Sequence, residues 1–286
     1  MDDIDWSMLS ALFEYKNITK TAEYLRISQP AITYRLNKLE EAFGVKIAYR
    51  GHRGIALTPQ GEFLADYSTR MLKELQQTRE SVLNFENKVQ GTLRISASSI
   101  FSRYKLPAIL SEFNEKYPLV EFHVITGWSE DVFNAIYKDQ SQIGILRGSY
   151  NFSHVKNLLM EEKLLIVSKE EIDLSNLPNL PRIYYNTDTS LKSLMDNWWY
   201  ENYDSLPSIT MRVDNMETCK ELVLNGLGYA VLPNILLKDD DNLHSYPCLH
   251  KDGSFVKRET WLIHKEEQGN NVVVNAFCEF MNEWEF

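Results

Sequence analysis

Two serines and two arginines in the C-terminal two thirds of the chain are suited to holding an anion. Ser98 and Ser99 follow an alternating apolar run and precede a predicted helix, where hydroxyls and the free N–H groups of a first turn attract negative charge. Arg147 directly follows the apolar run 143–146, and Arg258 precedes the last predicted strand. A guanidinium group offers a planar fork for a carboxylate. These residues point to a carboxylate site, although the serines could equally cap a helix and each arginine could be a surface charge.

The surroundings of these residues do not resemble an active site. No G-x-S-x-G turn surrounds the serines, and the chain has neither a phosphate-binding loop nor a G-x-G-x-x-G run. Cys219, Cys248 and Cys278 stand far apart, which predicts reduced structural thiols, and the scattered histidines offer no zinc pair. We therefore expect no catalytic residue, no metal and no cofactor, and an α/β-hydrolase-like enzyme is the disfavoured alternative.

A second polar group begins a predicted helix near the N-terminus. Ser28 is placed to cap this helix, and Pro30 falls in its first turn, where a missing N–H costs nothing. Gln29 and Thr33 lie on the outer side and carry groups that can read base edges in the major groove. The inward stripe follows helical spacing and consists of Ile32, Leu36, Leu39 and Phe43.

The neighbouring segments complete a DNA-binding pattern. Helices are predicted over 4–13 and from a cap at Thr19, and two β-rich runs, 45–50 and 55–58, flank a basic glycine-bounded turn. Together they are typical of a winged helix-turn-helix. The turn could be a merely solvated loop, but beside a recognition helix its arginines are placed for phosphate or a narrow minor groove. The predicted DNA contacts are Thr19, Ser28, Gln29, Pro30, Thr33, Tyr34, Arg35, Lys38, Arg50 and Arg53.

The charge distribution agrees with DNA contact at one end only. The formal net charge of the chain is −10. Between Lys16 and Arg53 there are eight basic and three acidic residues, whereas residues 91–286 hold 18 basic and 28 acidic residues. A local positive excess is the electrostatic footprint of a phosphate-binding surface, and the acidic remainder should repel DNA.

A long helix is predicted from Thr58-Pro59 to about Asn87. Apolar or small residues recur at heptad spacing in two rows, namely Leu64, Met71, Thr78 and Phe85, and Ser68, Leu75 and Val82. Such a seam is typical of a coiled coil. We expect a homodimer that binds the two half-sites of an inverted-repeat operator.

The C-terminal part alternates predicted strands and helices, which indicates α/β architecture with a cleft at the carboxyl ends of the strands. We expect three regions: a DNA-binding domain (1–58), a linker helix (59–90) and an effector-binding domain (91–286). The family resemblance identified below implies that the last region divides into lobe I (91–166 and 265–286) and lobe II (167–264).

The run S-Q-P-A-I-T-Y-R-L-N-K-L-E-E-A-F-G-V-K-I-A-Y-R, followed by R-G-I-A-L-T-P-Q-G, resembles the signature of LysR-type transcriptional regulators. The phrase V-L-N-G-L-G-Y-A-V-L-P is similar to their second lobe. Ala48 departs from the family's usual phenylalanine at a core position. The resemblance implies a winged helix-turn-helix plus linker helix, followed by a two-lobed α/β periplasmic-binding-protein-like effector domain, with chain crossings near Val167 and His264. It also implies tetramers built by pairing of the effector-binding domains, which are also called sensor domains below.

The resemblance further implies a small-molecule effector bound between the lobes. The expected lining is Ser98, Ser99, Thr126, Gly127, Arg147, Tyr184, Asn186, Asn215, Met216 and Arg258. The two arginines are similar to those of citrate-responsive Gram-positive members, so we expect a carboxylate, and an uncharged or amino-acid-like metabolite is the alternative. The acidic start Met1-Asp2-Asp3 does not resemble a secretory signal, and no apolar run has membrane-spanning length, which predicts a cytoplasmic protein without membrane contact.

Overall fold

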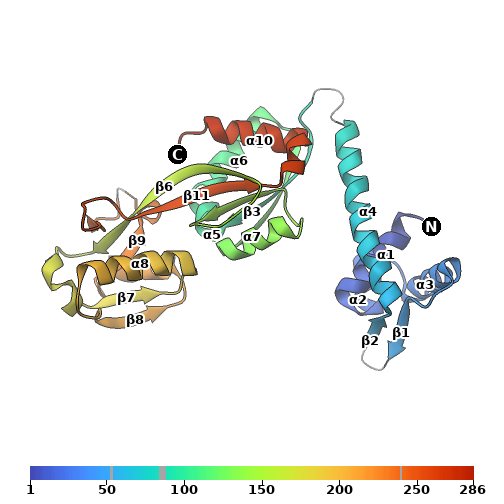
Figure 1. The fold of residues 1–286 in the computed structure, drawn as a ribbon, viewed down its shortest axis with the longest axis horizontal. Coiled ribbons are helices and arrows are strands. Elements are labelled where there is room, and N and C mark those ends of the chain that lie inside the picture. Colours follow the sequence, from blue (N-terminus) through green and yellow to red (C-terminus); the bar gives the residue numbers. More distant parts are fainter. Residues whose placement is uncertain (52–53, 84–87, 239) are drawn as a thin grey trace. The chain divides into compact units, whose positions relative to one another are not determined.

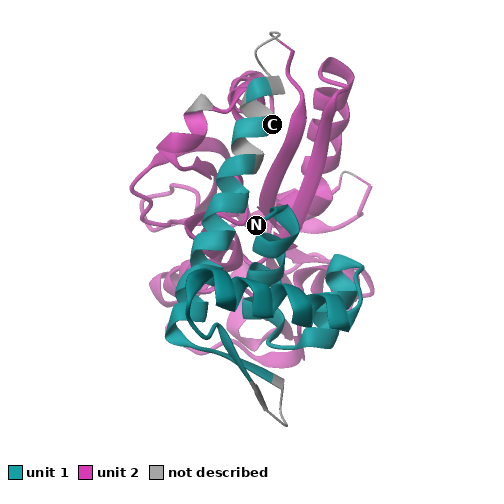
Figure 2. Cartoon of the chain, turned by 90° about the vertical axis from the view of Figure 1, so that its right-hand side faces the viewer, with its two compact units in different colours: residues 1–86 teal, residues 87–286 magenta. Residues whose placement is uncertain are grey.

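The computed structural model describes residues 1–51, 54–83, 88–238 and 240–286. The chain divides into two compact units, residues 1–86 and residues 87–286 (Figure 2). From the sequence we expected the C-terminal domain to begin at residue 91 and the linker helix, 59–90, to form a separate region. In the structure the helix belongs to the first unit, because its N-terminal half packs into that unit's core.

The first unit is a winged helix-turn-helix (Figure 1). Its elements are α1 (Asp3–Tyr15), α2 (Ile18–Leu25), α3 (Gln29–Phe43), β1 (Ala48–Gly51), β2 (Gly54–Leu57) and α4 (Pro59–Leu83). Ser28 caps α3 by accepting from the Ala31 N–H at 3.3 Å, and Gly44 ends it in the left-handed conformation at φ 65°. The cap of α2 is Asn17, which accepts from the Lys20 N–H at 3.1 Å, so the expected cap at Thr19 was wrong by two residues.

The core of the first unit lies between the helices and the wing. Met8 and Leu12 of α1 meet Ile32 and Leu36 of α3, and all are buried. Burying one such side chain contributes about 1.5–3 kcal/mol. Phe43, expected on the same inward stripe, is 40% exposed because it lies in the last turn of α3, at the margin of the core.

The T-P-Q-G segment joins the wing to α4 by close backbone contact. Thr58 donates its hydroxyl to the Lys46 carbonyl at 2.6 Å and accepts from the Gly61 N–H at 2.9 Å. A Cβ at Gly61 would stand 2.0 Å from the Ile47 carbonyl oxygen. Only glycine therefore allows the start of α4 to lie this close to the wing.

The expected seam on α4 is only partly available to a partner. Leu64 and Ser68 are buried within the first unit, whereas Val82 is 60% exposed. The Trp6 ring meets the Tyr67 ring edge-on, because α1 covers the N-terminal half of α4. Phe85, the last seam residue, lies outside the described residues. The part of the predicted seam that remains available to a partner therefore lies in the C-terminal half of this helix.

Lobe I of the second unit is built on a sheet with the order β4-β3-β5-β11-β6, in which β6 is the strand Val155–Ser168. Its elements are β3 (Gly91–Ser98), α5 (Ser99–Tyr104), α6 (Leu106–Lys116), β4 (Val120–Gly127), α7 (Ser129–Tyr137), β5 (Ile143–Arg147), β11 (Lys257–His264) and α10 (Val272–Glu283). Strands β3, β4 and β5 run parallel, so their carboxyl ends share one edge. Apolar side chains of α6 and α10, such as Phe113 and Phe277, bury one face of the sheet.

Lobe II contains β7 (Arg182–Tyr185), α8 (Thr189–Asn202), β8 (Ile209–Val213), α9 (Met216–Leu224), β9 (Ala230–Pro233) and β10 (His244–Pro247). Parallel strands β7 and β8 and the β9–β6–β10 strands enclose its core with α8 and α9. Trp198 and Trp199 of α8 are buried in this core.

Two long strands carry the chain between the lobes (Figure 1). Strand β6 (Val155–Ser168) pairs with β11 up to Lys163 and with β9 and β10 from Leu164 onward, so the first crossing falls between these two residues. The sequence missed the first half of β6. The second crossing was expected near His264, but β11 lies between β5 and β6 of lobe I from Lys257 on. Lobe II therefore ends before Lys257, because the β11 register belongs to the lobe I sheet.

Candidate functional site

A cavity of about 190 Å³ lies where the strand ends of the two lobes meet helix starts. Lobe I contributes the ends of β3, β4 and β5, and lobe II contributes the loops after β7 and β8. The strand-to-helix turns place polar side chains at one edge of each sheet, which is the usual ligand position in parallel α/β folds. The lining comprises Ser98, Ser99, Ile100, Gly127, Trp128, Ser129, Arg147, Asn186, Thr187, Asp188, Asp214, Asn215, Met216, Glu217 and Arg258.

The fold brings most of the expected ligand residues together here. Those lining the cavity are Ser98, Ser99, Gly127, Arg147, Asn186, Asn215, Met216 and Arg258. Thr126 is exposed and not part of the lining, because neighbouring residues of a strand face opposite sides. Tyr184 is also outside it, and its ring instead packs 5.0 Å from the Arg212 guanidinium.

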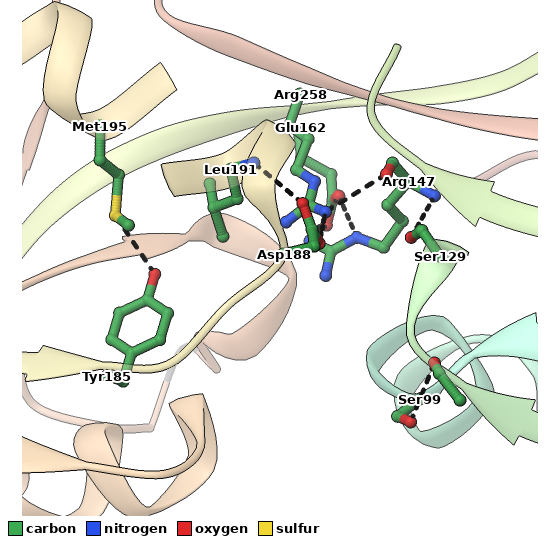
Figure 3. A network of polar contacts seen from close by, with 10 residues as sticks. Ser99, Ser129, Arg147, Glu162, Tyr185, Asp188, Leu191, Met195 and Arg258 are labelled. Carbon is green, nitrogen blue, oxygen red and sulfur yellow. Dashed lines mark hydrogen bonds and ion pairs between the residues drawn. The ribbon is translucent and has the colours of Figure 1, made fainter. Parts of the chain in front are cut away.

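Arg147 is already paired within the protein (Figure 3). Its Nε and Nη2 donate to the two carboxylate oxygens of Glu162 at 2.8 and 2.9 Å, and the exposed fractions of the two side chains are 2% and 0%. Burial, followed by the nearby positive charge of Arg258, lowers the pKa of Arg147, while Glu162 opposes that shift. Arg147 thus lines the cavity as predicted, but its guanidinium group already forms a buried ion pair within the chain, and its contact with a ligand stays a prediction.

Arg258 has a partner from the other lobe. Its Nη2 donates to Asp188, the N-cap residue of α8, which also accepts from the Leu191 N–H at 2.9 Å (Figure 3). The same nitrogen lies 3.3 Å from the Arg147 carbonyl oxygen. Arg258 is thus held at the junction of the lobes by one carboxylate and one backbone oxygen.

Two groups on the cavity wall have hydrogen-bonding capacity to spare. The Nε and Nη1 atoms of Arg258 and the Oγ of Ser98 are buried without a hydrogen-bond partner among the described residues. Buried polar groups are nearly always paired, so each such atom calls for an explanation. Both residues belong to the cavity lining.

Several residues of the lining were not predicted from the sequence, and neither was Glu162, which pairs with Arg147. Asp188 and Glu162 could not be found from local pattern alone, because their partners are 70 and 15 residues away. Trp128 follows Gly127 directly at the end of β4, so the strand-end rule could have found it. It is 49% exposed and adds an aromatic wall to the cavity.

The outer side of α3 presents the expected DNA-reading residues to solvent. Gln29, Pro30, Tyr34 and Lys38 are exposed, and Thr33 is half-buried. Gln29 Nε2 donates to the Thr19 hydroxyl at 3.0 Å, so a residue of α2 orients the amide at the start of α3. This arrangement fits a recognition helix with its N-terminal residues toward base edges.

Among the arginines predicted to contact DNA, Arg35 has acidic partners within the unit. Arg35 hydrogen-bonds Asp5 at 2.7 Å and Asp2 at 2.9 Å, and these bonds raise its pKa. Its guanidinium group ties α3 to the start of α1, and the predicted contact of Arg35 with DNA stays a prediction. Arg50 belongs to β1, and Arg53 lies outside the described residues.

The three cysteines are free thiols. Burial raises the pKa of Cys219 and Cys278 to about 12 and also raises that of Cys248. Such thiols are poor nucleophiles at neutral pH. Within the described ranges, no cluster of histidine, cysteine or acidic side chains could hold a metal ion, and no helix is long and apolar enough to cross a membrane.

Each of the two units matches a known protein family. Residues 5–62 match the bacterial regulatory helix-turn-helix family of lysR type, and residues 86–285 match the LysR substrate binding domain. The chain belongs to the LysR family of transcription regulators, which are not enzymes. Its two units are a DNA-binding domain and an effector-binding domain.

Relatives and solved structures agree with this assignment. An uncharacterized HTH-type transcriptional regulator, YraN of Bacillus subtilis, is 44% identical over 98% of this chain and 97% of its own. The regulator CysL of Bacillus subtilis is 27% identical over 89% and 88%. Full-length CbnR complexed with its target DNA shares the fold, with a TM-score of 0.66, 17% identity and 99% coverage of both chains. A full-length OxyR variant from Pseudomonas aeruginosa has a TM-score of 0.67 at 15% identity, covering 100% of this chain and 99% of that one.

Proposed function

We propose that this regulator binds an inverted-repeat operator through α3 and that a small carboxylate in the cavity between the lobes controls its activity. The exposed Gln29 and the half-buried Thr33 would read base edges, and Lys38, Arg50 and Arg53 would hold phosphates. A ligand alters activity only by binding one arrangement of the two lobes more tightly than another. The site of action would be the cytoplasm, where the operator lies.

The observation that carries the effector proposal is the set of buried, unpartnered donors on the cavity wall. Arg258 is 1% exposed and Ser98 is 5% exposed, and both line the cavity. A carboxylate accepts several hydrogen bonds at once, and those from a charged donor are roughly twice as strong as neutral ones. One carboxylate group on Arg258 and Ser98 therefore satisfies donors that the folded chain leaves open.

Citrate is one candidate suggested by the two arginines. Both arginines, however, already have a carboxylate of this chain, Glu162 for Arg147 and Asp188 for Arg258. A trianion would have to share these cations with two existing anions at short range, which is unfavourable in a partly buried site. A monocarboxylate requires only the donors that are still open.

We propose a homodimer formed along the C-terminal half of α4, with tetramers built by pairing of sensor domains. Met71 and Leu75 are half-buried, and Val82 is exposed on this half. An apolar seam at heptad spacing is stable when a second helix covers it. The two recognition helices would then meet two half-sites.

The effector proposal is tested with Ser98→Ala and Ser102→Ala in the full-length protein. Ser102 is the matched control, because its Oγ is also buried and unpartnered but Ser102 does not line the cavity. Neither change breaks an existing hydrogen bond, so both variants should fold. A panel of small metabolic acids, citrate included, is screened by thermal shift and the hits are measured by calorimetry. Losing a hydrogen bond to a charged group weakens binding by about tenfold or more in Ser98→Ala. An unchanged affinity in that variant, or no binding by any acid, contradicts the proposed site.

A further inference from the structure

The charges on the cavity wall are divided between the lobes. Arg147 at the end of β5 and Arg258 of β11 belong to lobe I, as does the unpartnered hydroxyl of Ser98. All the carboxylates of the lining come from lobe II, namely Asp188, Asp214 and Glu217. The described lining is therefore polarised, with cationic and donor groups on one lobe and acidic groups on the other.

Only one of the three carboxylates on the lobe II side of the cavity is paired with an arginine of the lining. Asp188 is committed to Arg258, but Asp214 is exposed and its Oδ1 accepts a hydrogen bond from the adjacent Asn215 side chain at 3.0 Å. Glu217 lies 3.5 Å from Arg103, whose side chain is 67% exposed. Glu217 itself is half-buried at 26% exposure, but a long contact to an exposed arginine outside the lining is weak, so Glu217 can still attract a second cation.

The excess of carboxylates distinguishes between classes of small acid. With Glu162 behind Arg147, each arginine of the wall has its own acid, and Asp214 and Glu217 add negative charge that nothing in the lining balances. A simple anion would meet this charge when the lobes close on it. A ligand that also carries a cation would bind favourably at both walls.

We propose, building on the proposed effector site, that the ligand is a small zwitterion of the α-amino acid type. Its carboxylate lies on Ser98 and the open N–H groups of Arg258, and its ammonium group lies between Asp214 and Glu217. Because these groups belong to different lobes, one small molecule bridges the lobes. The apolar lining from Ile100, Trp128 and Met216 receives the side chain.

The size of the cavity agrees with a small metabolite. Its volume of about 190 Å³ is below the range of about 300–1,000 Å³ that is common for drug-sized ligands. Trp128 also offers an aromatic face, which attracts an ammonium group or an apolar side chain equally well.

The test uses full-length protein and three matched sets of probes: the L-amino acids, their desamino carboxylic acids and their carboxamides. Thermal shift identifies binders, and calorimetry gives their affinities. We expect at least one amino acid to bind and to lose about tenfold or more in affinity when either the ammonium or the carboxylate group is missing.

Three variants then locate the ammonium group. Asp214→Asn and Glu217→Gln each remove one charge from the cavity wall, and Glu221→Gln removes one from an exposed position of α9 outside the cavity. The first two should weaken amino-acid binding by about tenfold but should not weaken binding of desamino acids, because those acids only gain from the loss of a repelling charge, whereas the third should change neither.

The possible failures are distinguishable. If a desamino acid or citrate binds as tightly as any amino acid and Ser98→Ala weakens it, the carboxylate site stands and the zwitterion proposal is overturned. Binding of an amino acid with equal affinity in Asp214→Asn and Glu217→Gln also overturns it. If no probe of any set binds, both proposals are overturned.

Discussion

Arg258 of β11 and Asp188 at the start of α8 form an ion pair between residues of different lobes. The Arg258 side chain is 1% exposed and that of Asp188 is 13% exposed, so the pair is largely withdrawn from water. The chain itself thus places a carboxylate on a guanidinium group that belongs to the cavity lining and has two nitrogens, Nε and Nη1, without a partner among the described residues. Any effector that engages Arg258 acts on a contact that already joins the lobes.

Asp188→Asn separates the two roles of this residue. Asparagine still caps α8, so the Leu191 N–H keeps its acceptor, but Arg258 loses its charged partner. Leaving a buried charge unpaired should lower the free energy of unfolding of the sensor domain by about 3 kcal/mol in urea denaturation. Asp188→Ala should cost about 1 kcal/mol more, because the cap is lost as well. Equal stability of Asp188→Asn and the parent would show that the pair contributes nothing.

The main effect of Arg147→Ala should be a lower free energy of unfolding of the sensor domain, whatever its effect on ligand binding. It leaves the Glu162 carboxylate, which is 0% exposed, without its bidentate partner. We expect a loss of about 3–5 kcal/mol in the free energy of unfolding. The double variant Arg147→Met with Glu162→Leu removes both charges and should recover most of that loss. A double variant as unstable as Arg147→Ala would contradict the buried-pair explanation.

Gly148→Ala should act as a wedge between the lobes. Gly148 follows β5 with φ 101°, and a Cβ there would stand 2.3 Å from the Ser190 Oγ in the first turn of α8. The variant should weaken effector binding by about tenfold or more and lower the melting temperature. Adding Ser190→Gly removes the clash but not the backbone strain, which costs about 1–3 kcal/mol. Recovery of affinity in the double variant, with stability still reduced, is the expected signature.

The wing should be sensitive to acid through Glu40. Its carboxylate accepts from the Ile47 and Ala48 N–H groups at 2.9 and 3.3 Å and from Lys46 at 2.6 Å. Burial by itself would raise the pKa of Glu40, but these hydrogen bonds lower it below the ordinary 4.5. The stabilisation is therefore present above the unfolded-state pKa and is lost as pH falls through the lower folded-state value.

The comparison of Glu40→Gln with the parent isolates this effect. At neutral pH the variant should lose about 1–2 kcal/mol in the unfolding of the DNA-binding unit. The difference should shrink as pH falls below the ordinary pKa of 4.5, because the parent's carboxylate becomes protonated. A difference independent of pH would assign the loss to packing instead.

Gln29→Ala and Lys38→Ala should affect operator binding in different ways. Gln29, held by Thr19, should discriminate at one position of each half-site by about 1–3 kcal/mol. Lys38 is exposed on α3 and should contribute to all sequences alike, lowering the salt dependence by about one unit when removed. Fluorescence anisotropy on operator and scrambled duplexes at several salt concentrations measures both effects. Equal losses on the two duplexes for Gln29→Ala would refute base reading.

Local sequence determined the DNA-binding unit to a large extent. Helical spacing, the Ser28 cap and Gly44 specify α3 within the chain segment itself, because capping and amphipathic periodicity are short-range properties. The position of Ser98 at a strand end, and thus at the cavity, could also be inferred from the alternation of strands and helices. The pairing of Arg35 could not be inferred in this way, because its partners Asp2 and Asp5 precede it by 33 and 30 residues.

Only the tertiary structure decided what the two sensor-domain arginines do. From the sequence, Arg147 and Arg258 were each predicted to offer a guanidinium group to a ligand carboxylate, with a surface charge as the alternative, which was favoured more for Arg258. The antiparallel register of β6 with β11 puts Glu162 opposite Arg258, and the side chain of Glu162 pairs with Arg147. The start of α8 brings Asp188 onto Arg258 from 70 residues away. Charge pairing depends on the distance between the charged groups in space, and strand register and lobe packing set that distance. Composition and periodicity do not specify it, because they describe only residues that are near one another in the sequence.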